Sequence, residues 1–341
     1  MQEGKIKLSI SKLIALWAFS ECALGGILHA FQFPFSGLLL AGFAVTIICT
    51  IGYTSDKPSQ DIIYGTLVAI AVKLALSPHS PVTAYIAVGF QGVLGALFFK
   101  FQKHNKLYYI LFGSIALFES AIQKVFTLTI IFGNALWNSI DTTANQLAKN
   151  LGGTEEFQYA LLLLIVYSLI YVVWGGIVGS WAYKLPYRIK KLDRNAVDLY
   201  ANSNISYGEK KGRIFGILTI VLLLVTTIYV AALGGTKNDI FWTIVRPFII
   251  ITAWYLIFNP LIIFIIRRFI NNQSSGILTV VDTIKEQIPH LRKITQQVAG
   301  YTTANYNGIE RIRYFIIILI LLACEEGGRY LIASLLSFLT K

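Results

Sequence analysis

The sequence has few cysteines and few charged residues. Its three cysteines, Cys22, Cys49 and Cys324, all lie inside apolar runs. They lack the CxxC or Cys/His spacing of a disulfide framework or a zinc site. Only 13% of the 341 residues are charged, whereas a soluble domain carries roughly 25%. A disulfide-stapled or ordinary soluble protein is therefore excluded as the interpretation of this sequence.

The sequence also lacks the motifs of the common catalytic sites. It contains no GxSxG, no HExxH, no Walker A Gly-Lys-Ser/Thr and no aspartate-rich diphosphate motif. We therefore expect no catalytic residues, no metal and no cofactor, and we predict that the protein is not an enzyme. Without a nucleotide-binding loop of its own, the chain would depend on other proteins for energy if it transports a solute.

Long apolar runs dominate what is present. Hydrophobic residues make up 55% of the chain, and the mean hydropathy is +0.64. A run of about 20 residues, rising about 1.5 Å per residue in a helix, crosses the roughly 30 Å hydrocarbon layer. The sequence therefore predicts an all-α integral membrane protein. The predicted spans are residues 12–31, 36–53, 62–78, 82–99, 107–133, 157–183, 213–234 and 241–266, with a last apolar run from 313 to the end.

Positive charges set the expected orientation and explain the net charge of +12. They cluster before the first predicted span, after the fourth and after the sixth, which share one side if every span crosses once. The positive-inside rule makes that side the cytoplasm, with the N-terminus cytoplasmic. This arrangement accounts for the basic balance, and we expect no nucleic-acid partner. The clusters are Lys5, Lys7 and Lys12; Lys100, Lys103 and Lys106; and Lys184, Arg188, Lys190, Lys191 and Arg194.

A polar stretch after the sixth predicted span indicates a domain boundary. The stretch RIKKLDRNAVDLYANSNISYGEKKGR is too charged to be buried, so we expect one domain over 1–183 and a C-terminal membrane extension over 184–341. Within the extension, apolar residues recur every three or four positions before Pro289, which predicts a cytoplasmic amphipathic helix that Pro289 breaks. They are Ile277, Val280, Val281, Ile284 and Ile288.

Ionisable residues inside the predicted spans form the first part of a candidate site. Glu21, Lys73, Glu119 and Lys124 lie at bilayer depth, where each charge costs about 2.5 to 3.5 kcal/mol. They either form a structural salt-bridge network, Glu21 with Lys73 or Glu119 with Lys124, or face a ligand pocket that opens to the outside. The sequence leaves both interpretations open.

Polar and aromatic residues near the predicted outer face form the second part. Aromatic and amide groups at one membrane face suit the capture of a small polar molecule, although each also fits an ordinary role. Trp137 fits an interfacial belt, the histidines fit loops or helix ends, and Gln91 fits an interhelical hydrogen bond. The candidate substrate-binding residues here are His29, Gln32, His79, Gln91, Asn134, Trp137 and Asn138.

Small residues indicate close helix packing. Gly175 and Gly179, in WGGIVGSW, are four apart on the sixth predicted span, and such spacing lets helix backbones approach closely in lipid. We include both among the candidate docking residues.

Residues 10–183 resemble the substrate-binding S component of energy-coupling factor (ECF) vitamin transporters. The resemblance is carried by six predicted spans with both ends cytoplasmic, by a first span rich in small residues, and by the runs FPFSGLLLAGF and SPHSPVTAYIAVGFQGVLGALFF. It implies a lid over 29–36, pocket walls at the outer ends of spans three to six, and docking through Ala15 and Ala18 onto a membrane T component driven by two cytoplasmic ATPases. The alanines are three apart instead of the usual four.

The resemblance ends near residue 184, and the extension looks only loosely like a T component. The Ala-Arg-Gly that ends coupling helices is absent, and Gly327, Gly328 and Arg329 are the nearest string. The extension is either a coupling component fused to the first domain or a family-specific addition that contacts a separate partner.

Together these features predict a membrane subunit of a bacterial inner-membrane uptake transporter. It would capture a vitamin or another small solute on the outer face, contact membrane lipid, and rely on partner subunits for energy. The alternative is a non-transport membrane scaffold or assembly factor that recruits a cytoplasmic partner.

Overall fold

The computed structural model describes residues 8–24, 36–77, 82–100, 105–152, 157–190 and 275–324, with isolated positions between 245 and 268. These residues form helices and no strand, as the sequence predicts. The continuous elements are α1 (Ile10–Phe19), the π-helix η1 (Ser20–Leu24), α3 (Ser36–Thr54), α4 (Pro58–Leu76), α5 (Val82–Phe99), α6 (Lys106–Phe132), α7 (Asn134–Asn150), α8 (Tyr159–Lys190), α13 (Ser275–Asn305) and α14 (Gly308–Cys324).

Three of these helices are long and apolar enough to cross a membrane: Pro58–Leu76, Lys106–Phe132 and Tyr159–Ile189. The segments Leu38–Thr54 and Thr83–Phe99 are shorter apolar helices. The predicted spans over 213–234 and after residue 324 lie outside the described residues, as does most of 241–266.

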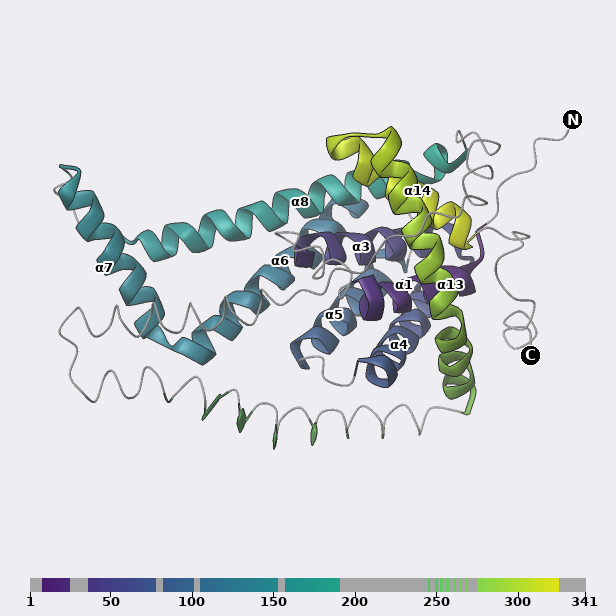
Figure 1. Ribbon diagram of the computed structural model, residues 1–341, viewed down its shortest axis with the longest axis horizontal. Coiled ribbons are helices and arrows are strands. Elements are labelled where there is room, and N and C mark those ends of the chain that lie inside the picture. The colour runs from purple at the N-terminus through teal and green to yellow at the C-terminus, as the bar shows by residue number, and fades with distance from the viewer. Residues whose placement is uncertain are drawn as a thin grey trace, which may run out of the picture.

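The core is built around α1. Trp17 and Phe19 are fully buried, and α1 packs against α3, α4, α13 and α14 (Figure 1). Gly65 of α4 leaves room for Ile14 and Trp17, since a Cβ at this position would lie 3.1 Å from Ile14 and 3.4 Å from Trp17. The backbone N–H of Ser9 donates to the carbonyl of Cys324 over 2.8 Å, which joins the start of α1 to the end of α14.

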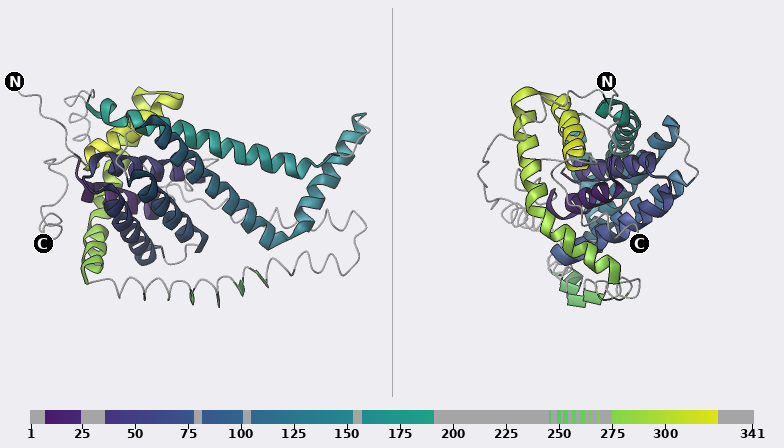
Figure 2. Two further views of the ribbon diagram at one scale, coloured as in Figure 1. Left: turned by 180° about the vertical axis from the view of Figure 1, so that it is seen from behind. Right: turned by 90° about the vertical axis from the view of Figure 1, so that its right-hand side faces the viewer.

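The predicted break of the amphipathic helix at Pro289 is wrong. Helix α13 continues through Pro289 to Asn305, and the right-hand view of Figure 2 shows it as one bent helix. A proline inside a helix removes one hydrogen bond and kinks the axis. Buried apolar residues on both sides of it, including Ile284 and Leu291, hold the two halves against α1, α4 and α14.

The sequence-based boundary at 183/184 falls inside a helix, because α8 continues to Lys190. Helices α13 and α14 also share one continuous apolar core with α1 and α4, to which Val281 and Ile318 belong. The described parts of both predicted domains are therefore packed together.

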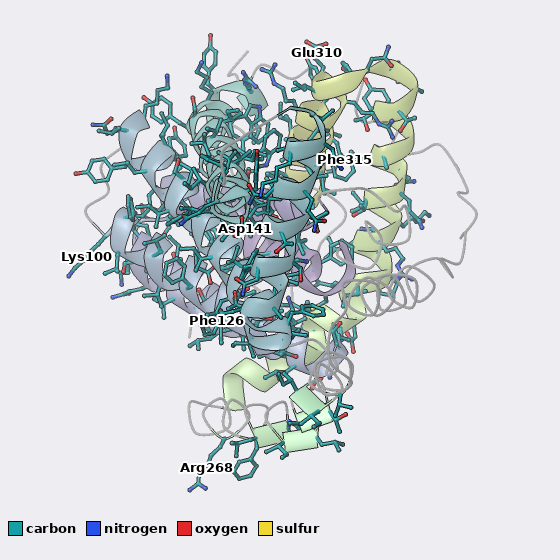
Figure 3. The ribbon with its side chains drawn as sticks, turned by 90° about the vertical axis from the view of Figure 1, so that its left-hand side faces the viewer. Lys100, Phe126, Asp141, Arg268, Glu310 and Phe315 are labelled. Carbon is teal, nitrogen blue, oxygen red and sulfur yellow. The ribbon has the colours of Figure 1, made fainter. Side chains whose placement is uncertain are left out.

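Helices α6 and α8 extend beyond the other helices, and α7 connects their far ends (Figure 1). Along α6 an exposed apolar stripe recurs every three or four residues, a pattern suited to lipid contact. Phe126, in the C-terminal half of α6 (Figure 3), is 64% exposed. The stripe consists of Leu107, Leu111, Ile115, Phe118, Ile122, Phe126 and Ile130.

The segment Asn134–Asn150, which connects the predicted spans over 107–133 and 157–183, is a helix, α7. It is tied to the start of α8 by two side chains. Asn145 exchanges hydrogen bonds of 2.9 Å with the N–H and the carbonyl of Phe157, and the carboxylate of Asp141 accepts from the N–H of Ala160 over 2.8 Å. An acceptor at this position satisfies an N–H that the first turn of a helix leaves unpaired.

Candidate functional site

The structure brings together two of the predicted site residues in a buried ion pair. The Nζ of Lys73 donates to Oε2 of Glu21 over 2.9 Å, and each side chain is 7% exposed. Lys73 lies in the last turn of α4 and Glu21 in η1. These residues are 52 positions apart. Their pairing therefore results from the packing of α1 and η1 against α4 and is not local.

A change of helix type positions Glu21. The α-helical α1 ends at Phe19 and continues as the π-helix Ser20–Leu24, a wider turn that is rare in proteins and often found at functional sites. The hydroxyl of Ser20 donates to the carbonyl of Trp17 over 2.7 Å across this junction. Cys22 lies in the same turn.

Other polar contacts lie at the same end of the bundle. The hydroxyl of Tyr85, near the start of α5, donates to the carbonyl of Ser77 just after α4, over 3.2 Å. The amide of Gln123 on α6 donates to the carbonyl of Thr83 over 2.7 Å. Tyr85 and Gln123 are not among the predicted site residues, because an isolated polar residue in an apolar run gives no sign of which carbonyl it contacts.

The second predicted charge pair does not form. Within the described part of the chain, no ion pair joins Glu119 to Lys124, and Lys124 is exposed. They are five residues apart, and partners on one helix face are three or four apart. The Oε2 atom of Glu119 is buried and has no hydrogen-bond partner. Gln91, on α5, is buried at 3% exposure.

The remaining candidates are dispersed or undescribed. The indole N–H of Trp137, at the α6–α7 corner, donates to the hydroxyl of Thr129 over 3.1 Å. Asn134 and Asn138 are exposed on α7. This helix connects the far ends of α6 and α8 and lies away from α4 (Figure 1). His29, Gln32 and His79 lie outside the described residues, as does the predicted lid over 29–36 except for Ser36, which begins α3.

The candidate docking residues make contacts within the chain. Ala15 and Ala18 are buried in the core at 1% and 0% exposure. Gly175 and Gly179 lie against the backbone of α6 at Gly113 and Tyr109. The close helix contact of this glycine pair is thus with α6, and docking onto a partner stays a prediction for all four residues.

Comparisons with known proteins do not identify the family of this chain. No protein-family model, no curated protein and no solved structure matches the chain. Among the residues that the structure describes, no group of three or more His, Cys, Asp or Glu side chains could hold a metal ion.

Proposed function

We propose that this chain is the solute-binding membrane subunit of an uptake transporter in a bacterial cytoplasmic membrane. Its N-terminus would be cytoplasmic, and separate membrane and ATPase subunits would supply the energy, as in S components of ECF transporters. The observation that supports the proposal best is the ion pair between Lys73 and Glu21 at the π-helical turn.

The energetics of the pair favour a functional role over a purely structural one. Removing two charges from water costs several kcal/mol per ion, and their attraction often fails to repay this cost. Apolar residues of similar size would hold α1 against α4 at least as well. Ionisable groups at membrane depth therefore usually mark a substrate or ion site, and a π turn at the same place agrees with that use.

The chemistry of the pair indicates the class of solute. A lysine ammonium binds a carboxylate or phosphate, and a glutamate carboxylate accepts hydrogen bonds from an amine or hydroxyl. A small polar solute with an acidic group and a donor group could therefore bind both residues. Its acidic group would bind the ammonium of Lys73, and its donor group would bind the carboxylate of Glu21. Vitamins and related micronutrients include such molecules.

The proposal is tested by what co-purifies with the protein. The full chain is purified from its native membrane and its bound small molecules are identified by mass spectrometry. We expect a solute that is lost in Lys73→Ala and retained in Lys106→Ala, which removes an exposed lysine at the start of α6. The exchange variant Glu21→Lys/Lys73→Glu keeps two opposite charges and tests the site if Lys73→Ala does not fold.

Two outcomes would overturn the proposal. A solute retained equally by wild type, Lys73→Ala and the exchange variant would place binding elsewhere. Repeated absence of any solute, together with retention of cytoplasmic proteins by the wild-type chain, would favour the scaffold function.

A further inference from the structure

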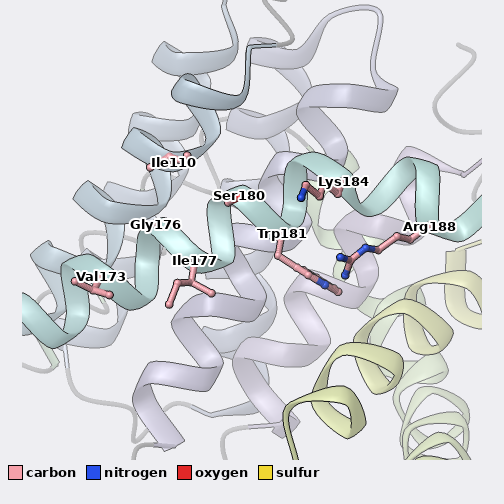
Figure 4. Close-up of a pocket in the computed structure, with 8 residues that line it drawn as sticks. All are labelled: Ile110, Val173, Gly176, Ile177, Ser180, Trp181, Lys184 and Arg188. Atoms are coloured by element: carbon pink, nitrogen blue, oxygen red, sulfur yellow. The ribbon is translucent and has the colours of Figure 1, made fainter.

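A groove on the outer surface of α8 combines an apolar half with a basic half. Its volume is about 410 Å³. The apolar half is formed by Ile110 of α6 with Val173, Gly176 and Ile177 of α8. The polar half is formed by Ser180, Trp181, Lys184 and Arg188 (Figure 4).

The order of these residues along α8 matches the order of groups in a membrane lipid. Val173 and Ile177, each more than half exposed, precede Trp181 by about two turns and one turn, and Lys184 and Arg188 follow it by about one and two turns. An aromatic residue at the boundary between apolar and basic segments is typical of the membrane interface. The groove thus passes from hydrocarbon chemistry to headgroup chemistry.

The polar half contains donors without acceptors. The indole N–H of Trp181 is buried and has no hydrogen-bond partner, and a buried unsatisfied donor is costly. Figure 4 shows Trp181 and Arg188 pointing toward one another below α8. Across the described ranges, neither Lys184 nor Arg188 makes an ion pair with a carboxylate.

A third cation adds to the unbalanced charge. Arg313 of α14 lies near enough to Arg188 for the two positive charges to repel. Like charges gathered beside an unsatisfied N–H favour the binding of an anion with several acceptor oxygens. A phosphodiester has such oxygens, and arginine binds it in a bidentate geometry.

We propose that this groove binds an anionic phospholipid. Its phosphate lies between Arg188 and Lys184 and accepts from the indole N–H of Trp181, and one acyl chain lies along Val173, Ile177 and Ile110. Basic pockets between membrane helices bind anionic headgroups in this way. The lipid would fix α8 against α14 on the side of the membrane that the positive-inside rule assigns to the cytoplasm.

The site is tested by native mass spectrometry of the full chain in detergent, titrated with phosphatidylglycerol or phosphatidylcholine. We expect one tightly retained phosphatidylglycerol and at least about tenfold weaker retention of phosphatidylcholine. Since each cation near the headgroup contributes about fivefold, Lys184→Gln/Arg188→Gln should weaken phosphatidylglycerol binding by more than tenfold. The matched control Arg292→Gln/Lys293→Gln removes two exposed charges from α13 and should leave it unchanged.

Two further variants separate headgroup recognition from folding. Trp181→Phe keeps an aromatic side chain, removes the N–H and should weaken phosphatidylglycerol binding several-fold. Ile177→Trp fills the exposed apolar half without removing any charge, and should weaken the binding of both lipids. Equal binding of the two lipids by the wild type, undiminished phosphatidylglycerol binding by Lys184→Gln/Arg188→Gln and Ile177→Trp, or an equal loss in the α13 control would each overturn the proposal.

Discussion

Gly113 of α6 and Gly175 of α8 bring the two helices into direct backbone contact. A Cβ atom on either glycine would collide with the backbone carbonyl of the other, and one on Gly179 would collide with the carbonyl of Tyr109. These neighbours are backbone atoms and cannot rotate away. The helix pair therefore has to separate if a side chain is added.

Alanine at Gly113 or Gly175 should destabilise the protein. Overpacking a close contact costs about 1 to 3 kcal/mol, which exceeds the gain of roughly 0.5 to 1 kcal/mol that alanine brings to a helix interior. The measurement is thermal unfolding of the purified chain in detergent. The control is Gly89→Ala on α5, whose Cβ would meet its nearest atom at 4.0 Å, and which should be neutral or slightly stabilising.

A second prediction concerns the corner between α7 and α8. Asn145 holds both backbone groups of Phe157 at 2.9 Å, and two lost hydrogen bonds at about 1 kcal/mol each should loosen the corner. Asn145→Ala should therefore speed hydrogen exchange at the amides of Phe157 and Ala160 by about tenfold or more. Gln146→Ala, an exposed neighbour, should not. Unchanged exchange in Asn145→Ala would show that these bonds do not hold the corner.

The sequence predicted the helical class and the location of several apolar helices well, because hydropathy and length are local properties. Glu21 and Lys73 lie in the first and third apolar runs, and an ion pair between them was one of the two predicted alternatives. The π turn that positions Glu21 has no such local signal. The course of α7 was missed because its polar residues resemble a loop until the apolar positions Leu136, Ile140 and Leu147 are read as a helical face.

The continuity of α13 through Pro289 shows a second kind of limit. Local preference favours a break at an internal proline, whereas burial of Val281, Ile284, Leu291 and Ile294 on both sides favours one helix. The packing contributions come from α1 and α4, which lie far away in sequence, and from α14, which follows α13 directly. Similarly, Lys184 and Arg188 form a cluster in the sequence, but only the packing of α14 on α8 brings Arg313 near Arg188.

A third prediction concerns pH. Burial, and secondarily the charge of Lys293, lowers the pKa of His290 on α13 below its ordinary value of 6.5. The unfolded chain therefore binds a proton more readily than the folded chain, so His290 contributes stability that is complete above about pH 6.5 and is lost as pH falls toward its folded pKa. Unfolding measured between pH 7.5 and 5.5 should show this loss, and His290→Gln should reduce it. An identical pH dependence in both proteins would contradict the assignment.

The last prediction isolates the ion pair from any bound solute. Lys73→Met leaves the carboxylate of Glu21 buried without its partner, which costs about 3 to 5 kcal/mol, and Glu21→Gln similarly leaves the ammonium unmatched. The combined variant Glu21→Gln/Lys73→Met removes both charges, so it should be more stable than Lys73→Met and close to wild type. Unfolding of solute-free protein in detergent gives the coupling free energy of this double-mutant cycle, which we expect to exceed about 2 kcal/mol. Additive effects would mean that the two side chains do not interact in the folded protein. A large coupling combined with solute binding that ignores Lys73 would instead assign the pair to holding α1 on α4, since the cycle reports on packing and the co-purification experiment reports on recognition.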